Sequence, residues 1–404
     1  MAPALFLALL ALAAAPPVPP PPVPSPPVPP AERAAGSAQL APDTEARWVP
    51  FDLTPGNQIR FEMTVDGRVV TAILDTGVSY SVLARRSAEA AGLAIVPGGS
   101  ATAIGGAVDI GWVPTRTLTL GGLTRSGGGL TVADLPAIAT GSARPADLLA
   151  GRDLTGGHAL DIDFAARRFR LLPTGRLPFG GAVAPLAIDR DRRVYVAAVT
   201  LGAARLRPMV VDTGDGSAIT VTAAGWRAAR LAAVPTTTAI SFGLAGSVVS
   251  TIGIVPRLSL GALVARNVEV RIEPPGGFSE TIGVAGRIGS GFLQNYRVLL
   301  DPAAGRMMLA PGPGADQPPL RSTSGLLLGV ERDRLRVLHV MRGGPAAAAG
   351  WRAGEKICTI DGAPVTADYA ASPLARWSAG APGRTVTLGM CDGASRRLTL
   401  RAFY

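Results

Sequence analysis

Two short stretches of the chain carry an aspartate in the same local setting. The first contains Asp75-Thr76-Gly77 and the second Asp212-Thr213-Gly214, each directly after a run of apolar residues. Two carboxylates held about 3 Å apart cannot both ionise cheaply, so such a pair would share one proton. The ionised member could take a proton from water while the protonated member donates to a peptide carbonyl oxygen. The pair therefore predicts hydrolysis without a metal, a cofactor or a covalent intermediate.

The same order of elements surrounds both motifs. An alternating segment and a turn precede each aspartate, over residues 59–68 and 194–202. A short apolar segment and an alanine-rich helical pattern follow, over residues 80–91 and 218–232. We therefore expect two related lobes that each contribute one aspartate to a shared site. The alternative is a pair of ordinary Asp-Gly-type turns in unrelated β-structure.

The paired motifs resemble those of the pepsin and retropepsin superfamily of aspartic proteases, especially the bacterial retropepsin-like forms with both lobes in one chain. The resemblance covers about residues 48–312. It implies a mainly β, two-lobed acid-protease fold with Asp75 and Asp212 as the catalytic pair, for which a monomer is sufficient. It also gives the rest of both motifs a supporting role, in Thr76, Gly77, Thr213 and Gly214.

Two glycine-containing hairpins are expected to cover the cleft between the lobes. In such proteases a mobile hairpin, the flap, closes over the substrate. The resemblance places one flap at Ile104, Gly105 and Gly106 and the other at Phe242 and Gly243. A common glycine turn is the alternative at these positions. The family also has an apolar-Gly segment behind each aspartate, which we place at residues 147–151 and 284–287.

The residues directly after the two motifs, Val78 and Asp215, depart from the family's usual Ser, Thr or Ala. If Asp215 faces the pair, we expect it to favour protonation and to lower the pH at which the site works. Asp215→Ser would then raise the pH optimum. If Asp215 faces solvent, it is only a turn residue. Since either departure could weaken proteolysis, a non-catalytic peptide-binding or scaffold protein on the same fold remains the alternative function.

Other acidic and histidine residues do not form a metal-binding pattern. Asp161 and Asp163 alternate along a predicted strand and are expected on a solvated face. His158 and His339 fall in different predicted domains, so a zinc site is not expected. Asp153 is expected to pair with an arginine in a structural role. The sequence thus predicts no metal and no cofactor.

The formal charge of +10 does not indicate nucleic-acid binding. The positive charge is almost all arginine, scattered along the chain, and lysine occurs once, at Lys356. Aromatic residues make up 5%, and no basic helix or RNA-binding motif occurs. We therefore expect peptide or protein substrates as partners, and no nucleic acid.

Residues 1–30 resemble an export signal followed by a spacer. Residues 4–15 form an apolar run, and residues 16–30 are nearly all Pro and Val, which favours polyproline II. No Lys or Arg precedes the apolar run, which is atypical of a signal. We expect an exported protein, periplasmic or envelope-associated, with an extracellular location as the alternative. An uncleaved segment could tether it to a membrane or envelope surface.

Residues 321–404 resemble a PDZ domain of the bacterial periplasmic-protease type. The motif that carries the resemblance spans residues 340–362 and combines Gly-Pro-Ala, a short helix and Asp361-Gly362. PDZ domains bind C-terminal peptides by adding them to a sheet edge. The resemblance places this binding at Leu326, Leu327, Leu328 and Gly329, and the alternative is a structural PDZ domain with a closed groove.

The domain boundaries follow from these assignments. Residues 31–47 form a linker, 48–173 the first lobe, 174–190 an inter-lobe linker, 191–312 the second lobe and 313–320 a further linker. Cys358 and Cys391 both fall in the last domain. They are either free thiols or one disulfide, and export favours the disulfide.

Overall fold

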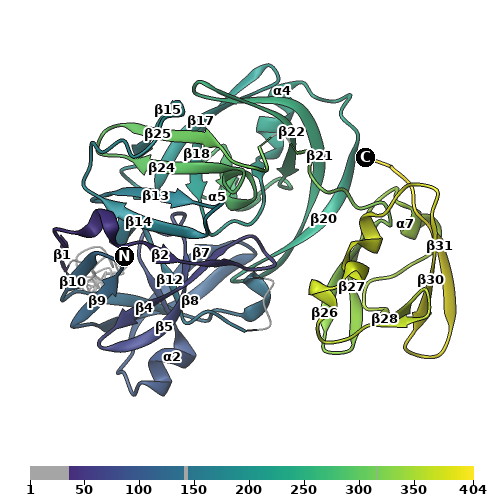
Figure 1. Cartoon of the computed structure of the whole chain (residues 1–404), viewed down its shortest axis with the longest axis horizontal. Coiled ribbons are helices and arrows are strands. Elements are labelled where there is room, and N and C mark those ends of the chain that lie inside the picture. The colour runs from purple at the N-terminus through teal and green to yellow at the C-terminus, as the bar shows by residue number, and fades with distance from the viewer. Residues whose placement is uncertain (1–35, 141–143, 316) are drawn as a thin grey trace, which may run out of the picture.

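The computed structural model describes residues 36–140, 144–315 and 317–404, which form four β-sheets with short helices between strands (Figure 1). The mainly β fold expected from the sequence is confirmed. The predicted signal-like segment and spacer at residues 1–30 lie outside the described residues. Within the described ranges, no helix is long and apolar enough to cross a membrane.

The first sheet has 11 strands and leads into the first Asp-Thr-Gly loop. The alternating segment predicted before Asp75 forms a hairpin of β4 and β5, whose turn places Asp66 and Gly67 at positive φ. The strands are β1 (Ser37–Leu40), β3 (Asp52–Leu53), β4 (Ile59–Val65), β5 (Arg68–Leu74), β6 (Val82–Ala84), β7 (Val96–Ala103), β8 (Gly106–Pro114), β9 (Thr117–Leu120), β10 (Leu123–Ser126), β11 (Gly129–Ala133) and β12 (Leu148–Ala150). The helices are η1 (Thr44–Ala46), α2 (Arg85–Ala90), η2 (Ala137–Thr140) and α3 (Arg152–Thr155).

The second sheet has eight strands and repeats the central pairing order of the first. The order β5-β12-β6-β11-β8-β7 in the first sheet corresponds to β18-β23-β19-β22-β21-β20 in the second. The strands are β16 (Ala187–Ile188), β17 (Tyr195–Leu201), β18 (Ala204–Asp212), β19 (Ile219–Val221), β20 (Thr236–Gly243), β21 (Gly246–Leu260), β22 (Leu263–Ile272) and β23 (Gly286–Gly289). The helices are α4 (Ala223–Ala229), α5 (Phe278–Thr281) and α6 (Ser290–Leu293).

A third sheet of six strands joins the two halves of the chain. It contains β2 (Val49–Pro50), β13 (Ala159–Asp163), β14 (Arg168–Leu172), β15 (Ala182–Pro185), β24 (Tyr296–Asp301) and β25 (Arg306–Pro311). Strand β13 pairs antiparallel with β24, so that Leu160 lies opposite Leu300. One hydrophobic core runs through the first, second and third sheets and includes Phe61, Tyr195 and Leu300. The two halves are therefore held together by backbone pairing and by a common core.

The solvated position predicted for Asp161 is wrong. Its strand β13 lies between β14 and β24 inside the third sheet, and Asp161 is 0% exposed. Arg170 and Arg297 donate to its carboxylate at 3.0 Å and 2.9 Å. The prediction failed because alternation on one strand does not show that a neighbouring strand covers its polar face with arginines. Asp163 is partly exposed.

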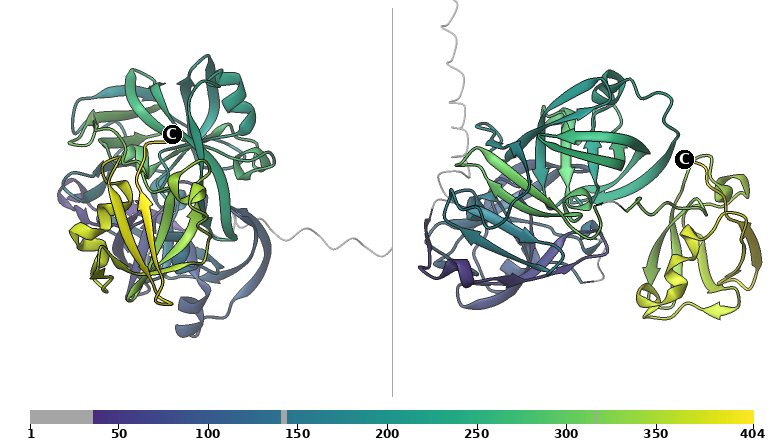
Figure 2. Two further views of the ribbon diagram at one scale, coloured as in Figure 1. Left: turned by 90° about the vertical axis from the view of Figure 1, so that its right-hand side faces the viewer. Right: turned by 45° about the horizontal axis from the view of Figure 1, so that its top comes forward.

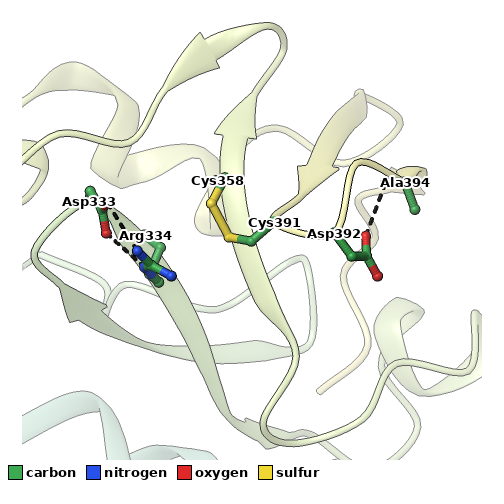
Figure 3. The surroundings of a disulfide bond; sticks show 6 residues. All are labelled: Asp333, Arg334, Cys358, Cys391, Asp392 and Ala394. Atoms are coloured by element: carbon green, nitrogen blue, oxygen red, sulfur yellow. Dashed lines mark hydrogen bonds and ion pairs between the residues drawn. A yellow bond between two sulfur atoms is a disulfide. The ribbon is translucent and has the colours of Figure 1, made fainter.

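The fourth sheet belongs to residues 321–404 and forms a separate body beside the second sheet (Figures 1 and 2). Its strands are β26 (Leu326–Glu331), β27 (Arg334–Val340), β28 (Lys356–Ile360), β29 (Ala363–Pro364), β30 (Thr385–Met390) and β31 (Ser395–Thr399). Its helices are α7 (Pro345–Ala348), η3 (Tyr369–Ala371) and η4 (Pro373–Ala379). It has its own core around Trp351 and Leu388. A disulfide joins Cys358 on β28 to Cys391 directly after β30 (Figure 3).

The C-terminal body contacts β20 of the second sheet. Thr238 Oγ1 lies 2.8 Å from His339 Nε2, and Thr237 Oγ1 donates to the Arg342 carbonyl at 2.8 Å. Met341 packs against Ala239 of the same strand. Because β20 continues to Phe242 and Gly243, the C-terminal body touches the strand that ends in the second predicted flap.

Candidate active site

The two aspartates lie at the ends of equivalent strands. Asp75 follows β5 and Asp212 ends β18, and they are 9% and 7% exposed. Thr76 Oγ1 donates to the Val211 carbonyl at 2.7 Å and accepts from Thr213 N at 3.0 Å. Thr213 Oγ1 donates to the Leu74 carbonyl at 2.7 Å and accepts from Thr76 N at 3.1 Å. Each fully buried threonine therefore ties its own loop to the other one.

Gly77 and Gly214 allow the aspartates to approach each other. A Cβ added at Gly77 would lie 2.3 Å from the Asp212 Cγ, and one at Gly214 would lie 2.3 Å from the Asp75 Cγ. The amide of each glycine donates to the aspartate of its own loop at 3.0 Å. The structure thus brings together all six residues that the sequence assigned to the pair and its support.

Both carboxyl groups have a raised pKa, with partly different causes. Burial raises the pKa of Asp75 well above its usual value, and the neighbouring Asp212 carboxylate raises it further. Burial and then Asp215 raise the pKa of Asp212 to about 6, against an opposing effect of Arg287. Since the pKa of both carboxyl groups is raised, the pair keeps a proton to a higher pH than two separate aspartates would.

A buried charged cluster borders Asp212. Arg287 Nε donates to Asp215 Oδ2 at 2.7 Å and lies 3.9 Å from Asp212 Oδ2. Arg287 Nη1 donates to Glu273 Oε1 at 2.8 Å and to Ser279 Oγ at 2.9 Å. Burial alone would raise the pKa of Asp215, but Arg287 and Ser217 outweigh it and lower this pKa to about 2. Asp215 and Arg287 therefore form a charged pair at neutral pH.

Asp215 faces the aspartate pair and not the solvent. Its expected effect on the working pH is, however, opposite to the one inferred from the sequence. A carboxylate near Asp212 raises the pKa of Asp212, so ionisation of the pair needs a higher pH, not a lower one. Removing the Asp215 charge should accordingly move the working range downward. For Asp215→Ser the structure therefore favours a lowered optimum, opposite to the shift expected from the sequence, because a raised pKa of Asp212 moves its ionisation to higher pH.

A different cluster lies behind the first aspartate. Arg125 Nη1 donates to Asp153 Oδ2 at 2.9 Å, which confirms the structural arginine pairing expected for Asp153. Both the amide and the hydroxyl of Ser81 donate to Asp153 Oδ1, at 2.8 Å and 2.7 Å. Ser81 Oγ accepts from the Gly151 amide at 3.0 Å. These bonds fix the segment behind Asp75 to the strand that follows it.

The apolar-Gly segment was predicted correctly in the first half and misplaced in the second. In the first half, β12 runs parallel to β5 with Ala150 opposite Leu74. In the second, β23 runs parallel to β18 with Ile288 opposite Val211. The equivalent of Gly151 is thus Gly289, and the predicted match at 284–287 lies three residues too early. Both stretches contain an apolar residue before glycine, and only the pairing with β18 distinguishes them.

Both predicted flaps are hairpins whose tips touch. β7 and β8 turn at Ile104 and Gly105, while β20 and β21 turn beyond Gly243. The Ala245 amide donates to the Ile104 carbonyl at 3.2 Å. The flaps and the aspartates enclose a cavity of about 460 Å³, lined by Asp75, Asp212, Ile104, Phe242 and Gly243, among others. Gly105 and Gly106 shape the first tip without lining this cavity.

Several functional contacts were missed from the sequence. Gln58 Nε2 donates to the Gly214 carbonyl at 2.8 Å, and Asn57 Nδ2 donates to the Gly216 carbonyl at 3.0 Å. These amides link the first sheet to the second aspartate loop. The Arg287 cluster was missed too, although an arginine in the segment behind the aspartate was a usable signal. No three His, Cys, Asp or Glu side chains are grouped to hold a metal in the described part of the chain.

The predicted peptide-binding residues of the C-terminal body lie outside this cavity. Leu326, Leu327, Leu328 and Gly329 belong to β26, which is at the edge of its sheet and pairs only with β27. Leu326 is 2% exposed and Leu328 packs against the core that includes η4. Leu327 instead packs with Met341 in the contact with the second sheet.

Comparison with known proteins identifies part of the chain. Residues 61–154 match the family model described as aspartyl protease. The matched segment includes the first aspartate motif, the first flap hairpin and Asp153. A comparison with curated proteins gave no match. The segment that carries Asp75 is therefore an aspartyl-protease-like domain.

Proposed function

We propose that the chain is an aspartic endopeptidase that hydrolyses peptide bonds with a water molecule activated between Asp75 and Asp212. The observation that carries this proposal is the pair of mutually bonded loops, which bring two buried carboxyl groups, both with a raised pKa, beneath two flaps. The match of residues 61–154 to aspartyl proteases supports it. Both aspartates come from one chain, so a monomer is sufficient.

In the proposed mechanism Asp212 is the base and Asp75 is the acid. Ionised Asp212 accepts a proton from water as the water oxygen attacks the peptide carbonyl carbon. Asp75 donates its proton to the carbonyl oxygen, which gives a neutral tetrahedral intermediate. When the C–N bond breaks, the leaving nitrogen receives the proton held by Asp212, and Asp75 recovers one from the intermediate. The pair thus returns to its starting state without a cofactor.

Cleavage of a mixed peptide library by the purified protein, read by mass spectrometry from pH 3 to pH 8, tests this function. New peptide ends that appear with the wild type and not with Asp212→Asn support it. The alternative is a non-catalytic peptide-binding or scaffold protein. Peptides that are retained by the protein but never cut across this pH range would establish that alternative.

The C-terminal body is proposed to be a PDZ domain that captures the C-terminus of a protein substrate. Strand β26 lies at the edge of its sheet, which supports the addition of a peptide strand there. Leu328 of β26 and Leu374 of η4 are partly buried apolar residues that could contact such a peptide. Tethering would raise the local substrate concentration without changing the chemistry. Deletion of residues 321–404 should then raise KM for proteins with an apolar C-terminus and leave kcat nearly unchanged.

The contact between β20 and the C-terminal body favours a competing role in supporting the second flap. In that case the deletion would lower kcat on every substrate, including short internal peptides. Steady-state kinetics on one short and one long substrate separate the two roles. Circular dichroism of the truncated protein checks that its remaining sheets are folded.

Export is proposed from the apolar run at residues 4–15 and the proline-rich stretch after it. The expected location is the periplasm or the cell envelope, with an extracellular location as the alternative and a membrane or envelope tether if the segment is retained. Fusion of residues 1–47 to a reporter that is active only after export would test this. A reporter that stays inactive would refute export.

A further inference from the structure

The cavity at the aspartates continues into a second, larger cavity. This second cavity has a volume of about 930 Å³ and shares Gly214, Asp215 and Phe242 with the first. It extends beneath β20 and along β22 as far as Arg376 of the C-terminal body. A peptide extended through the first cavity along this side would therefore place its side chains against β22.

The wall on β22 contains an arginine, Arg271, with two unsatisfied hydrogen-bond donors. The Nε and Nη1 atoms of Arg271 are buried, and neither has a hydrogen-bond partner in the structure. Leaving a buried donor unsatisfied is costly, so a ligand that supplies an acceptor there gains more than it would at an exposed arginine. The equivalent position in the first sheet is Thr131. Thr131 lies opposite Val82 on β6, as Arg271 lies opposite Thr220 on β19. The arginine is thus specific to the second half of the cleft.

The surrounding charges favour an anion. Arg266 and Arg376 also line this cavity and are exposed to it. The carboxyl groups that line it are Asp215, whose charge is matched by Arg287, and Glu269. Burial raises the pKa of Glu269, against the attraction of Arg271. The cavity therefore offers guanidinium donors in excess of ionised acceptors.

We propose that this second cavity is a substrate subsite that selects a carboxylate side chain, Glu or Asp, on one side of the scissile bond, with Arg271 as its main donor. The inference deepens the proposed endopeptidase function and rests on it. The first cavity, with Val78, Val82 and Leu149 on its wall, holds the apolar side chain on the other side of the bond. The preferred substrate thus combines an apolar residue and an acidic one across the cleavage site.

Binding to the uncleaving full-length variant Asp75→Asn tests the subsite directly. Fluorescent peptides with one apolar anchor are scanned with Glu or Gln at each position, and dissociation constants are measured by anisotropy. A charge-assisted bond to a buried donor should give at least about tenfold tighter binding of Glu over Gln at one position. Arg271→Thr, which copies the first sheet, should reduce that ratio to about twofold or less, and Arg271→Lys should retain part of it.

Arg205→Gln is the matched control, since Arg205 is exposed on β18 and does not line either cavity. It should keep the full preference for Glu, and thermal unfolding checks that each variant is folded. Equal binding of Glu and Gln at every position would overturn the subsite, as would an unchanged preference in Arg271→Thr. Library cleavage by the wild type separates the two proposals. Cleavage without acid preference rejects only the subsite, and acid-selective binding without cleavage rejects only the endopeptidase.

Discussion

The two halves of the cleft share a backbone plan and differ in the charge that it presents. In the first sheet a row of facing residues crosses three strands: Thr131, Val82 and Leu149. In the second sheet the equivalent row is Arg271, Thr220 and Arg287. After the motifs, Val78 likewise corresponds to Asp215. An apolar wall therefore faces Asp75, while an ionic wall faces Asp212.

The two halves separate what positions each aspartate from what changes its pKa. The crossed threonine bonds and close glycine contacts are the same on both sides, so each aspartate is placed by the same geometry. Their surroundings diverge because Asp212 also has Asp215 and Arg287 as charged neighbours, of which Arg287 lowers its pKa. A duplicated scaffold can therefore supply an acid and a base from identical side chains.

The largest effect is expected when either aspartate is changed, because both halves have this residue in common. Asp75→Asn and Asp212→Asn should each reduce kcat/KM by at least about 10²-fold, since each removes one partner of the acid–base pair. Peptide cleavage followed by mass spectrometry measures the loss. Asp52→Asn, at an exposed aspartate in the first sheet, is the control and should cleave normally. Substantial activity in either of the two cleft variants would reject the paired mechanism.

The second prediction concerns a variant that removes Arg287 from the ionic wall. Arg287→Leu introduces the residue type of Leu149 but leaves Asp215 and Glu273 buried without their cation. Breaking a buried ion pair from one side should reduce the free energy of unfolding by about 3–5 kcal/mol. The double variant Asp215→Val/Arg287→Leu restores the apolar pair of the first half and should recover part of the loss. Urea unfolding measures both effects.

An exposed arginine provides the control for that experiment. Arg205→Leu should change the free energy of unfolding by no more than about 0.5 kcal/mol, as is usual for surface sites. If Arg287→Leu were as stable as the wild type, the ion pair would not contribute to the stability of the second half. If the double variant were less stable than Arg287→Leu, the apolar pair of the first half could not substitute for it.

The third prediction concerns how much the ionisation of buried Asp212 reduces the free energy of unfolding. The pKa of Asp212 is about 6 in the folded chain against an ordinary value of 3.8, which corresponds to about 3 kcal/mol. Below about pH 4 the group is protonated in both the folded and the unfolded chain, so no penalty arises. Between about pH 4 and pH 6 the unfolded chain loses this proton while the folded chain keeps it, so the wild type loses stability, and above about pH 6 the penalty is complete. Asp212→Asn should therefore stabilise the protein by up to about 3 kcal/mol at pH 8 and hardly at pH 4.

Thermal unfolding at several pH values measures this difference. Asp75→Asn should behave in the same direction, because the pKa of Asp75 is also raised. A stabilisation that did not depend on pH would show that the gain comes from packing and not from removal of a buried charge.

The smallest effect is expected from Asp215→Asn, which tests how far the charge of Asp215 distinguishes the second half from the first. Asp215→Asn removes the carboxylate that raises the pKa of Asp212 and leaves Arg287 in place. The acidic limb of the kcat/KM profile should then move from about pH 6 towards the ordinary aspartate value. An unchanged limb, measured beside Asp52→Asn, would mean that the charge of Asp215 is fully compensated by Arg287 at the catalytic pair.

Much of the site could be predicted because its key residues are local in sequence. The Asp-Thr-Gly motifs, the alternating strands before them and the glycine hairpins depend on short-range patterns that the structure retains. The segment behind the second aspartate could not be placed in this way, because residues 284–286 and 287–289 both have an apolar residue directly before glycine. Its position depends on parallel pairing with β18, and parallel strands far apart in sequence have no local register signal.

The sequence by itself determined which groups could perform chemistry, that there are two of them, and that glycine must follow each Asp-Thr pair. Only the tertiary structure decided what surrounds them. Arg287 and Asp215 lie 72 residues apart in the chain and meet because β19, β22 and β23 are in register. That register sets which side chains face the cleft, and a slip of one residue would turn them away. The charged surroundings of each aspartate, and with them the pKa of its carboxyl group, are thus a property of the folded sheets.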